Sequence, residues 1–425
     1  MPAPSTTAST PKSPFIQLPD RPNLRYLRDQ ARNMVRKGVC ASLSSAQFAI
    51  ARRYGYSSWP KLEAAVVSIS SGRMGVLERA ILDDNASALT ALLHDDPDLI
   101  HREGHWIQRK RHNKYQPLAY AAYFGKVEAM EVLLGAGADV HIGQQRALRA
   151  ATYSDDYEAA IDLLIQHGAD PNATTRSASG YEYSVIDYPC MLLAAGALRR
   201  LLSHGARLTP RSIGFVVAAN ERNPKGKAKC LEVMAESGQA LPDTSPMAMH
   251  RRDIDRIEVL LRKDPGLFSR HFDEKEIFPA EFGTTHPAAS AYVTPLTGGV
   301  TLLHMAVEFC DMDMVEWLLK SGADANVRSA VDADGYGGWT PLFHTVATLH
   351  RPRGFPEFAA VLLRHGADPL AQASIRKPMP DDTAGSSMWK DVTAVEYAND
   401  FIYPDLVNQE AVSLIAAASA NCRMS

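Results

Sequence analysis

The stretch TLLHMAVEFCDMDMVEWLLKSGADANV, residues 301–327, contains two runs with helical spacing that are separated at Asp311. The first run has a small side chain at Ala306, which lets a neighbouring element approach closely. The second run carries Trp317 and two leucines as an apolar stripe. A glycine after such a run suits a left-handed C-cap, so the Gly-Ala-Asp ending predicts where the second helix stops. The stretch is therefore either a single helical hairpin or one unit of an array.

The ending of this stretch recurs along the chain. Five segments share it: VLLGAGADVH (132–141), LLIQHGADPN (163–172), RLLSHGARLT (200–209), WLLKSGADAN (317–326) and VLLRHGADPL (361–370). A second phrase has four versions: QPLAYAAYFG (116–125), TLLHMAVEFC (301–310), TPLFHTVATL (340–349) and VTAVEYANDF (392–401). Thr at its start can cap a helix, and Pro in the first turn loses no needed hydrogen bond. The recurrence predicts an array, because one unit cannot bury its apolar face alone.

These two phrases resemble the ankyrin repeat, whose helix–turn–helix–hairpin unit begins with Thr-Pro-Leu-His and ends near Gly-Ala-Asp. The resemblance covers about residues 76–420, with about nine units on a period of about 33 residues, several of them degenerate. It implies an all-α ankyrin-repeat solenoid over residues 76–267 and again over 301–420. It also implies a protein-interaction scaffold that binds its partner through a concave groove and hairpin fingers.

Two segments precede the array. Residues 1–21 are predicted to be a flexible tail, because their Ser, Thr, Pro and Ala cannot bury enough apolar surface to become ordered. Residues 22–75 are predicted to form a helical module, with Ser44 and Gln47 at capping-box spacing and Pro60 in a first turn. The phrase AQFAIARRYGYSSWPKLEAAV in this module resembles a helical segment found before ankyrin arrays in bacterial and some fungal proteins. We interpret the module as a cap that shields the first repeat.

Two insertions interrupt the array, at residues 268–300 and 371–391. The first has no helical period, yet it contains five aromatic residues. Loops of this length in a compact array are either functional or disordered, and the aromatic residues favour a packed segment. The second insertion is more polar.

The composition excludes several classes of protein. The net charge of −3 gives no general attraction to nucleic acid or to an anionic membrane. The five cysteines are far apart and form no C-x-x-C pair, so we expect a reducing cytoplasm and no zinc site. No apolar run approaches 18 residues, and the first residues contain no signal peptide, so no membrane association is expected. We expect no metal and no cofactor.

One histidine and one carboxylate are candidates for chemistry. His304 occupies the histidine position of Thr-Pro-Leu-His, where the resemblance implies hydrogen bonds between neighbouring units. Glu308 follows four residues later and shares a helix face with His304. Acid–base work would also need a converging element, which His286 of the first insertion could supply. The alternative function is therefore an enzyme or a small-molecule-binding protein with a pocket near His304, Glu308 and Trp339, covered by residues 268–300.

Aromatic and basic residues are the candidates for partner binding. The resemblance places Tyr120, Tyr123 and Trp339 at first-helix and finger positions that line the concave surface, where aromatic side chains make good hot spots. Some aromatic residues at such positions pack between units instead. Arg109 and Arg111 lie on a basic finger that could contact an acidic protein. Nucleic-acid binding through this finger is a third alternative, which the overall charge does not favour.

Overall fold

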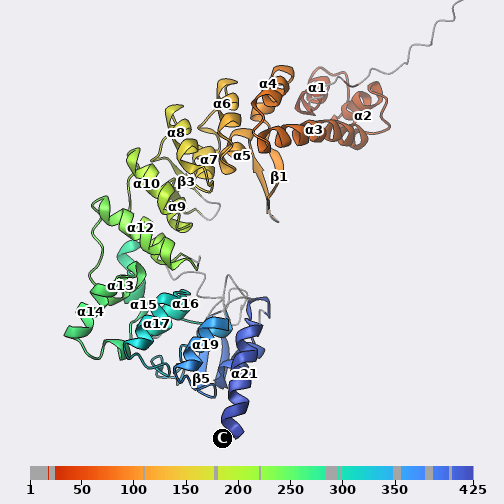
Figure 1. Ribbon diagram of the computed structural model, residues 1–425. Helices are drawn as coiled ribbons and strands as arrows, with labels where there is room; N and C mark the ends of the chain where they lie inside the picture. The colour runs from red at the N-terminus through yellow and green to blue at the C-terminus, as the bar shows by residue number, and fades with distance from the viewer. Residues whose placement is uncertain are drawn as a thin grey trace, which may run out of the picture. The chain divides into compact units, whose positions relative to one another are not determined.

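The structure is a computed structural model that describes residues 18, 24–108, 111–176, 180–219, 222–283, 294–296, 299–347, 356–378, 386–401 and 404–424. The chain divides into two compact units, Met1–Ile142 and Gly143–Ser425. Helices dominate the described part of both units, and the strands there form three two-stranded antiparallel hairpins (Figure 1).

The first unit begins with three helices, α1 (Leu24–Arg36), α2 (Leu43–Arg53) and α3 (Trp59–Leu82). Helix α2 starts with a capping box in which Ser42 accepts a hydrogen bond from the Ser45 N–H at 3.2 Å. The capping box predicted at Ser44 was therefore wrong by two residues, because Ser42 has the extended backbone that an N-cap needs while Ser44 lies inside the helix. Pro60 does lie in the first turn of α3.

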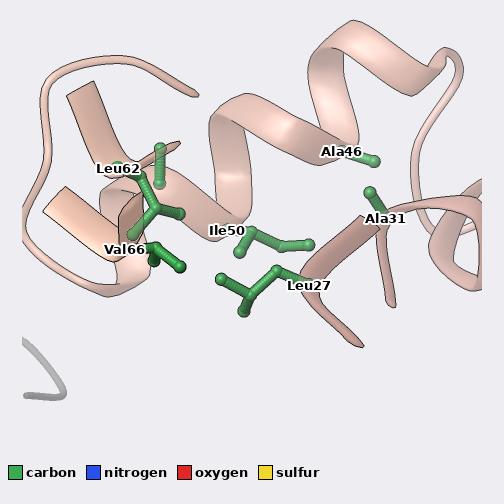
Figure 2. Packing of buried hydrophobic residues seen from close by; sticks show 7 residues of the cluster. Leu27, Ala31, Ala46, Ile50, Leu62 and Val66 are labelled. Carbon is green, nitrogen blue, oxygen red and sulfur yellow. The ribbon is translucent and has the colours of Figure 1, made fainter. Parts of the chain in front are cut away.

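The three helices share a small core of their own (Figure 2). Each helix contributes a pair of apolar residues four positions apart, which places each pair on one helix face. The pairs are Leu27 and Ala31 on α1, Ala46 and Ile50 on α2, and Leu62 and Val66 on α3. Helix α3 continues past this core and packs against helices α4 and α5 of the repeats, which joins the module to the array.

The repeats of the first unit follow α3. Their elements are α4 (Ala86–Asp95), η1 (Pro97–His101), β1 (Gly104–Gln108), β2 (Arg111–Tyr115), α5 (Pro117–Tyr123) and α6 (Val127–Gly135). Neighbouring repeats are linked by polar contacts as well as by packing, since the Asp84 carboxylate accepts a hydrogen bond from the Ala129 N–H at 2.8 Å. Strands β1 and β2 form the hairpin finger that was predicted for this segment.

The second unit starts with α7 (Ile142–Ala151), whose first residue belongs to the first unit, and continues through short helices and one hairpin. These elements are α8 (Tyr157–Gln166), β3 (Thr174–Arg176), β4 (Glu182–Ser184), α9 (Asp187–Met191), α10 (Ala195–Ser203), α11 (Pro210–Val217), α12 (Pro224–Glu236), α13 (Ser245–Arg251) and α14 (Ile254–Lys263). The predicted left-handed glycines after the second helices are confirmed. Gly137, Gly168, Gly205, Gly322 and Gly366 have φ angles of 94°, 92°, 81°, 98° and 84°.

The insertion at 268–300 packs onto the repeats where the structure describes it. It contains α15 (Glu274–Ile277) and η3 (Ala280–Phe282), after η2 (Leu267–Ser269) at its start. Phe272, Phe278 and Phe282 are buried, and the backbone of Phe272 bridges to Val300. Packing of the aromatic residues is thus confirmed for these three.

The rest of the second unit holds three more helix pairs and the second insertion. Its elements are α16 (Leu302–Glu308), α17 (Met312–Lys320), α18 (Phe343–Val346), α19 (Pro356–Arg364), β5 (Gln372–Pro378), β6 (Ser386–Thr393), α20 (Ala394–Asn399), η5 (Pro404–Leu406) and α21 (Gln409–Met424). The insertion predicted at 371–391 forms the β5–β6 hairpin. The loop before α18 joins this hairpin, because Gly337 and Ser374 exchange backbone hydrogen bonds of 2.7 and 3.2 Å. Only glycine fits there, since a Cβ on Gly337 would lie 2.0 Å from the Ala330 carbonyl oxygen.

Replacing Leu62 with Ala should destabilise the N-terminal module, because it leaves a cavity in the core shared by α1, α2 and α3. We expect the free energy of local unfolding to fall by about 2–5 kcal/mol. Hydrogen exchange of the amides of residues 24–66, measured by mass spectrometry, reports this loss as faster exchange. The control Leu43→Ala lies at an exposed position of the same module and should change this free energy by less than about 0.5 kcal/mol. Equal acceleration in both variants would contradict the core role of Leu62.

Candidate functional site

His304 is a structural residue whose two ring nitrogens are both engaged. Its Nδ1 accepts a hydrogen bond from the Thr301 N–H at 3.3 Å and lies 2.9 Å from the Thr301 hydroxyl. Its Nε2 donates to the Trp339 carbonyl at 3.0 Å, which links this repeat to the next one. Burial lowers the pKa of His304 to about 3. His304 therefore makes the contact between units that the ankyrin resemblance implied, and it has no ring nitrogen left for chemistry.

Glu308 forms a buried polar centre, but with partners other than the predicted ones. Its Oε1 accepts from Arg222 at 2.5 Å, and its Oε2 lies 2.7 Å from Nδ1 of His344. All three side chains are at most 5% exposed. His344 thus occupies the place that the sequence argument gave to His304. The other predicted partner, His286, lies outside the described residues.

His344 has a ring nitrogen that the described protein leaves unused. Because Glu308 is paired with Arg222 and accepts through Oε2, Nδ1 of His344 carries the hydrogen that it donates. Its Nε2 is buried and has no hydrogen-bond partner among the described residues. His344 follows Phe343, which fills the histidine position of this repeat, so the repeat motif does not require it.

Lys377 and Tyr397 complete the buried centre. The Lys377 side chain is fully buried, with Nζ 5.6 Å from the centre of the Phe401 ring. Burial lowers its pKa to about 7, and the nearby Glu308 carboxylate opposes that shift. Burial also raises the pKa of Tyr397, and Glu308 raises it further. Both side chains are therefore within electrostatic reach of Glu308, although neither was predicted from the sequence.

A second buried group joins the first insertion to the repeats. The Lys227 amine donates to the Val217 carbonyl at 2.9 Å and lies 3.7 Å from the centre of the Phe309 ring. His250 lies 3.1 Å from the Ile277 carbonyl of α15. Burial lowers the pKa of both side chains. The described part of the insertion is thus anchored on α13.

Two of the five predicted partner-binding residues, Tyr120 and Trp339, are buried. Tyr120 is 1% exposed and donates to Glu78 at 2.9 Å, and Trp339 is 4% exposed, so the expectation that these two side chains face a partner was wrong. Both pack between elements instead. Tyr123 is half-buried on α5. Arg111 pairs with Gln108 in the hairpin, but its side chain is not described, and Arg109 lies outside the described residues.

One exposed surface of the second unit was missed by the sequence argument. Val331 and Met388 are 62% and 60% exposed, and the Tyr336 hydroxyl donates to the Met388 sulfur at 3.1 Å. The guanidinium of Arg376 and the amine of Lys390 lie 4.9 and 5.6 Å from the centre of the Tyr336 ring. We call these five residues the C-terminal finger surface. This surface joins the loop before α18 to strands β5 and β6. No local sequence motif predicts that the loop packs against these strands.

Family comparisons account for two parts of the chain. A model of three ankyrin repeats matches residues 77–175, and a model of one ankyrin repeat matches residues 298–330. The chain contains ankyrin repeats. The predicted fold class, all-α with ankyrin repeats, is confirmed. Neither model matches the helices at residues 24–75. The relation of this module to the helical segments that precede other ankyrin arrays therefore remains a prediction.

Parts of the chain are similar to several known proteins. The ADP-ribosylation factor GTPase-activating proteins AGD4 and AGD2 of Arabidopsis thaliana are 41% and 44% identical over 71 residues, which is 17% of this chain and 8% of each relative. The 2-5A-dependent ribonuclease of Homo sapiens is 41% identical over 69 residues, 16% of this chain and 8% of the relative. This chain therefore matches less than a tenth of these relatives. The crystal structure of the human ASB11 ankyrin repeat domain is 19% identical, with a TM-score of 0.29, over 71% of this chain and 98% of that one.

The described part of the chain contains neither a membrane-spanning helix nor a cluster of metal-binding side chains. No described helix is long and apolar enough to cross a bilayer. The described His, Cys, Asp and Glu side chains form no group of three or more that could hold a metal ion.

The buried His304 should make stability depend on pH. Its folded pKa is about 3, whereas an unfolded histidine has a pKa of about 6.5. As the pH falls below about 6.5, the unfolded chain binds a proton that the folded chain does not, so stability falls by about 1.4 kcal/mol per pH unit. Replacing His304 with Asn should remove this component. Urea unfolding followed by tryptophan fluorescence between pH 7 and 4 measures both slopes, and identical slopes would refute the assignment.

Proposed function

We propose that this chain is a protein-interaction scaffold whose partner contacts the β1–β2 hairpin and the aromatic cluster at its base. Ankyrin repeats are general protein-interaction modules, which supports the broad role. The observation that carries the specific proposal is the aromatic cluster of Tyr115, Tyr123 and Phe124, which we call the N-terminal aromatic cluster. It lies within the three repeats that the family model matches.

The N-terminal aromatic cluster joins the end of β2 to the end of α5. The ring centres of Tyr115 and Tyr123 are 6.4 Å apart, and those of Tyr123 and Phe124 are 5.2 Å apart with an edge-to-face orientation. Phe124 is 36% exposed, while Tyr115 and Tyr123 are half-buried. Their rings support one another, so little conformational freedom is lost when a partner covers them.

The hairpin above the cluster supplies charge and a further aromatic residue. Its strands pair in register from Gly104 opposite Tyr115 to Gln108 opposite Arg111. The sequence of this finger, GHWIQRKRHNKY, contains a tryptophan and four Lys or Arg residues. Complementary charge favours a partner segment rich in Asp and Glu, with an apolar residue that reaches the cluster.

The C-terminal finger surface supports a second contact of the same kind. Val331 and Met388 are exposed, and the cationic groups of Arg376 and Lys390 both lie near the ring of Tyr336. An aromatic ring with such contacts is rigid before a partner arrives. Both fingers therefore combine a pre-arranged tyrosine with basic residues. We further propose that the interaction occurs in the cytoplasm, which the five free cysteines support.

Photo-cross-linking tests the proposed surface. p-Benzoylphenylalanine placed at Phe124 should cross-link a protein partner in extract of the native cell, because this position is exposed at the proposed contact. The same probe at Phe48, which is 54% exposed on α2, is the matched control and should not capture that partner. Capture at Phe48 alone would contradict the proposal.

Charge reversal tests the role of the basic finger. The double change Arg109→Glu and Arg111→Glu should weaken capture of the partner by about tenfold or more, because it replaces attraction with repulsion. The double change Arg262→Glu and Lys263→Glu, at exposed positions of α14, alters the net charge equally and should leave capture unchanged. Pull-down with purified wild type and variants measures the difference. An equal loss in the control would show that only overall charge matters.

A further inference from the structure

We propose that the turn between helices α1 and α2 is a peripheral membrane-binding site for an anionic phospholipid surface. Four residues form this site, and we call them the basic turn: Arg36, Lys37, Val39 and Leu43. The basic turn belongs to the N-terminal module, which neither family model matches. It is independent of the protein-binding surfaces proposed above and adds a second class of partner to them.

The N-terminal module carries a charge that the whole-chain average conceals. Residues 22–75 contain nine Lys or Arg and two Asp or Glu, a net charge of +7. The whole chain contains 45 Lys or Arg and 48 Asp or Glu, so the rest of it has 36 against 46, a net charge of −10. A charge asymmetry of this size indicates an anionic partner for the basic part. The average of −3 therefore does not exclude a membrane surface as a partner of this module.

Ion pairs within the module leave most of its cations unused. Both of its acidic residues are already paired, Glu63 with Arg28 and Asp29 with Arg32, the latter at 3.0 Å. Six further cations are exposed and form no ion pair within the described residues: Arg25, Arg36, Lys37, Arg52, Arg53 and Lys61. Their charge is thus available to a partner.

Helix stability does not account for this excess of positive charge. The helix dipole favours cations in the last turn, where α1 has Arg36. It disfavours Arg25 and Lys61, which lie in the first turns of α1 and α3. The first turns of all three helices also lack an acidic residue, which the dipole would favour there. The positive charge therefore has no evident structural role inside the module.

The backbone of the basic turn is fixed at both ends. Gly38 ends α1 in the left-handed conformation, with a φ angle of 71°. The N–H groups of Gly38 and Val39 donate to carbonyls of the last turn of α1 at 3.0 and 2.9 Å, the pattern of a Schellman motif. Helix α2 then begins with the capping box described above. The turn therefore holds its side chains in place before any partner binds.

The basic turn presents apolar side chains to solvent. Val39 is 66% exposed and Leu43 is 44% exposed. In a Schellman motif the residue after the glycine frequently packs back on the helix, but Val39 is left largely uncovered. Arg36 and Lys37 directly precede it and are exposed as well. One short segment thus combines two cations with two large apolar side chains, and this combination suits the interface of an anionic bilayer.

A membrane surface fits the basic turn better than a nucleic acid does. The phosphates of a nucleic acid would use the two cations but would give the exposed valine and leucine no apolar cover. A bilayer uses both kinds of side chain, because headgroups meet the cations and the acyl boundary covers the apolar pair. Helix α1 itself cannot insert, since its apolar residues Leu27 and Ala31 are buried in the core of the module (Figure 2). The contact is therefore made by the turn.

Flotation of the full chain with lipid vesicles tests the proposal. Vesicles of phosphatidylcholine alone are compared with vesicles of three parts phosphatidylcholine to one part phosphatidylserine. We expect the chain to float only with the phosphatidylserine vesicles and to be released as salt is raised, because ions screen the attraction. Hydrogen exchange of the amides of residues 37–43 should slow on the same vesicles.

Matched variants separate the basic turn from general charge effects. The double change Arg36→Gln and Lys37→Gln should weaken vesicle binding by about tenfold or more. Arg262→Gln with Lys263→Gln, on α14, removes the same charge elsewhere and should bind as wild type.

A second pair of variants tests insertion of the apolar side chains. Val39→Ser should weaken vesicle binding by about threefold or more, because a serine gains little from the acyl boundary. Val76→Ser, at a 55% exposed position of α3, is its control and should bind as wild type. Hydrogen exchange of residues 24–66 without lipid verifies that each variant keeps the module folded. If the double cation variant loses the module, Val39→Ser carries the test.

Three outcomes would overturn the proposal. The first is the absence of flotation with phosphatidylserine vesicles at low salt. The second is an equal loss of binding in the variants of the basic turn and in their controls. The third is tighter binding to a labelled DNA duplex than to vesicles, measured by fluorescence anisotropy and unchanged by Val39→Ser, because it would assign the cations to nucleic acid.

Discussion

Each repeat of this chain carries an apolar face that only its neighbours can cover, and the remaining features of the fold depend on this constraint. Leu133 and Leu318, on the second helices of two distant repeats, are fully buried in this way. A polar side chain at such an interface must find partners there, since water cannot reach it. His304 meets the condition through Thr301 and Trp339, and so the repeat motif can include a histidine in a buried position.

The features that could be predicted from the sequence are those encoded by local spacing. Glycines after the second helices, the two helices around Asp311 and the role of His304 all follow from a repeated phrase, and the structure agrees with them. Tyr120 was misjudged because the phrase gives its position on a helix but not what covers it. The covering group is Glu78 on α3, which lies outside the repeated phrases. Residues whose neighbours come from non-repeat segments cannot be assigned from periodicity alone.

The same limit explains what was found and missed at the buried centre. Glu308 was found because it follows His304 by one helical turn. Its real partners are Arg222 and His344, which are 86 and 36 residues away in sequence, and Lys377 comes from a hairpin whose register contains a bulge. The sequence did contain a clue to His344. In this repeat Phe343 fills the histidine position of the motif, so His344, one residue later, must face a different environment. The ankyrin pattern alone could not show that this environment was polar.

Strand β5 connects the buried centre to the C-terminal finger surface. Lys377 points into the buried centre from this strand, while the backbone of Ser374 holds the loop before α18 through hydrogen bonds with Gly337. Arg376, between them, reaches outward to Asp332 and Asp334 of that loop at 2.8 Å. Side chains alternate along a strand, so Arg376 and Lys377 point to opposite faces of β5. This short segment therefore contributes to both the buried centre and the C-terminal finger surface.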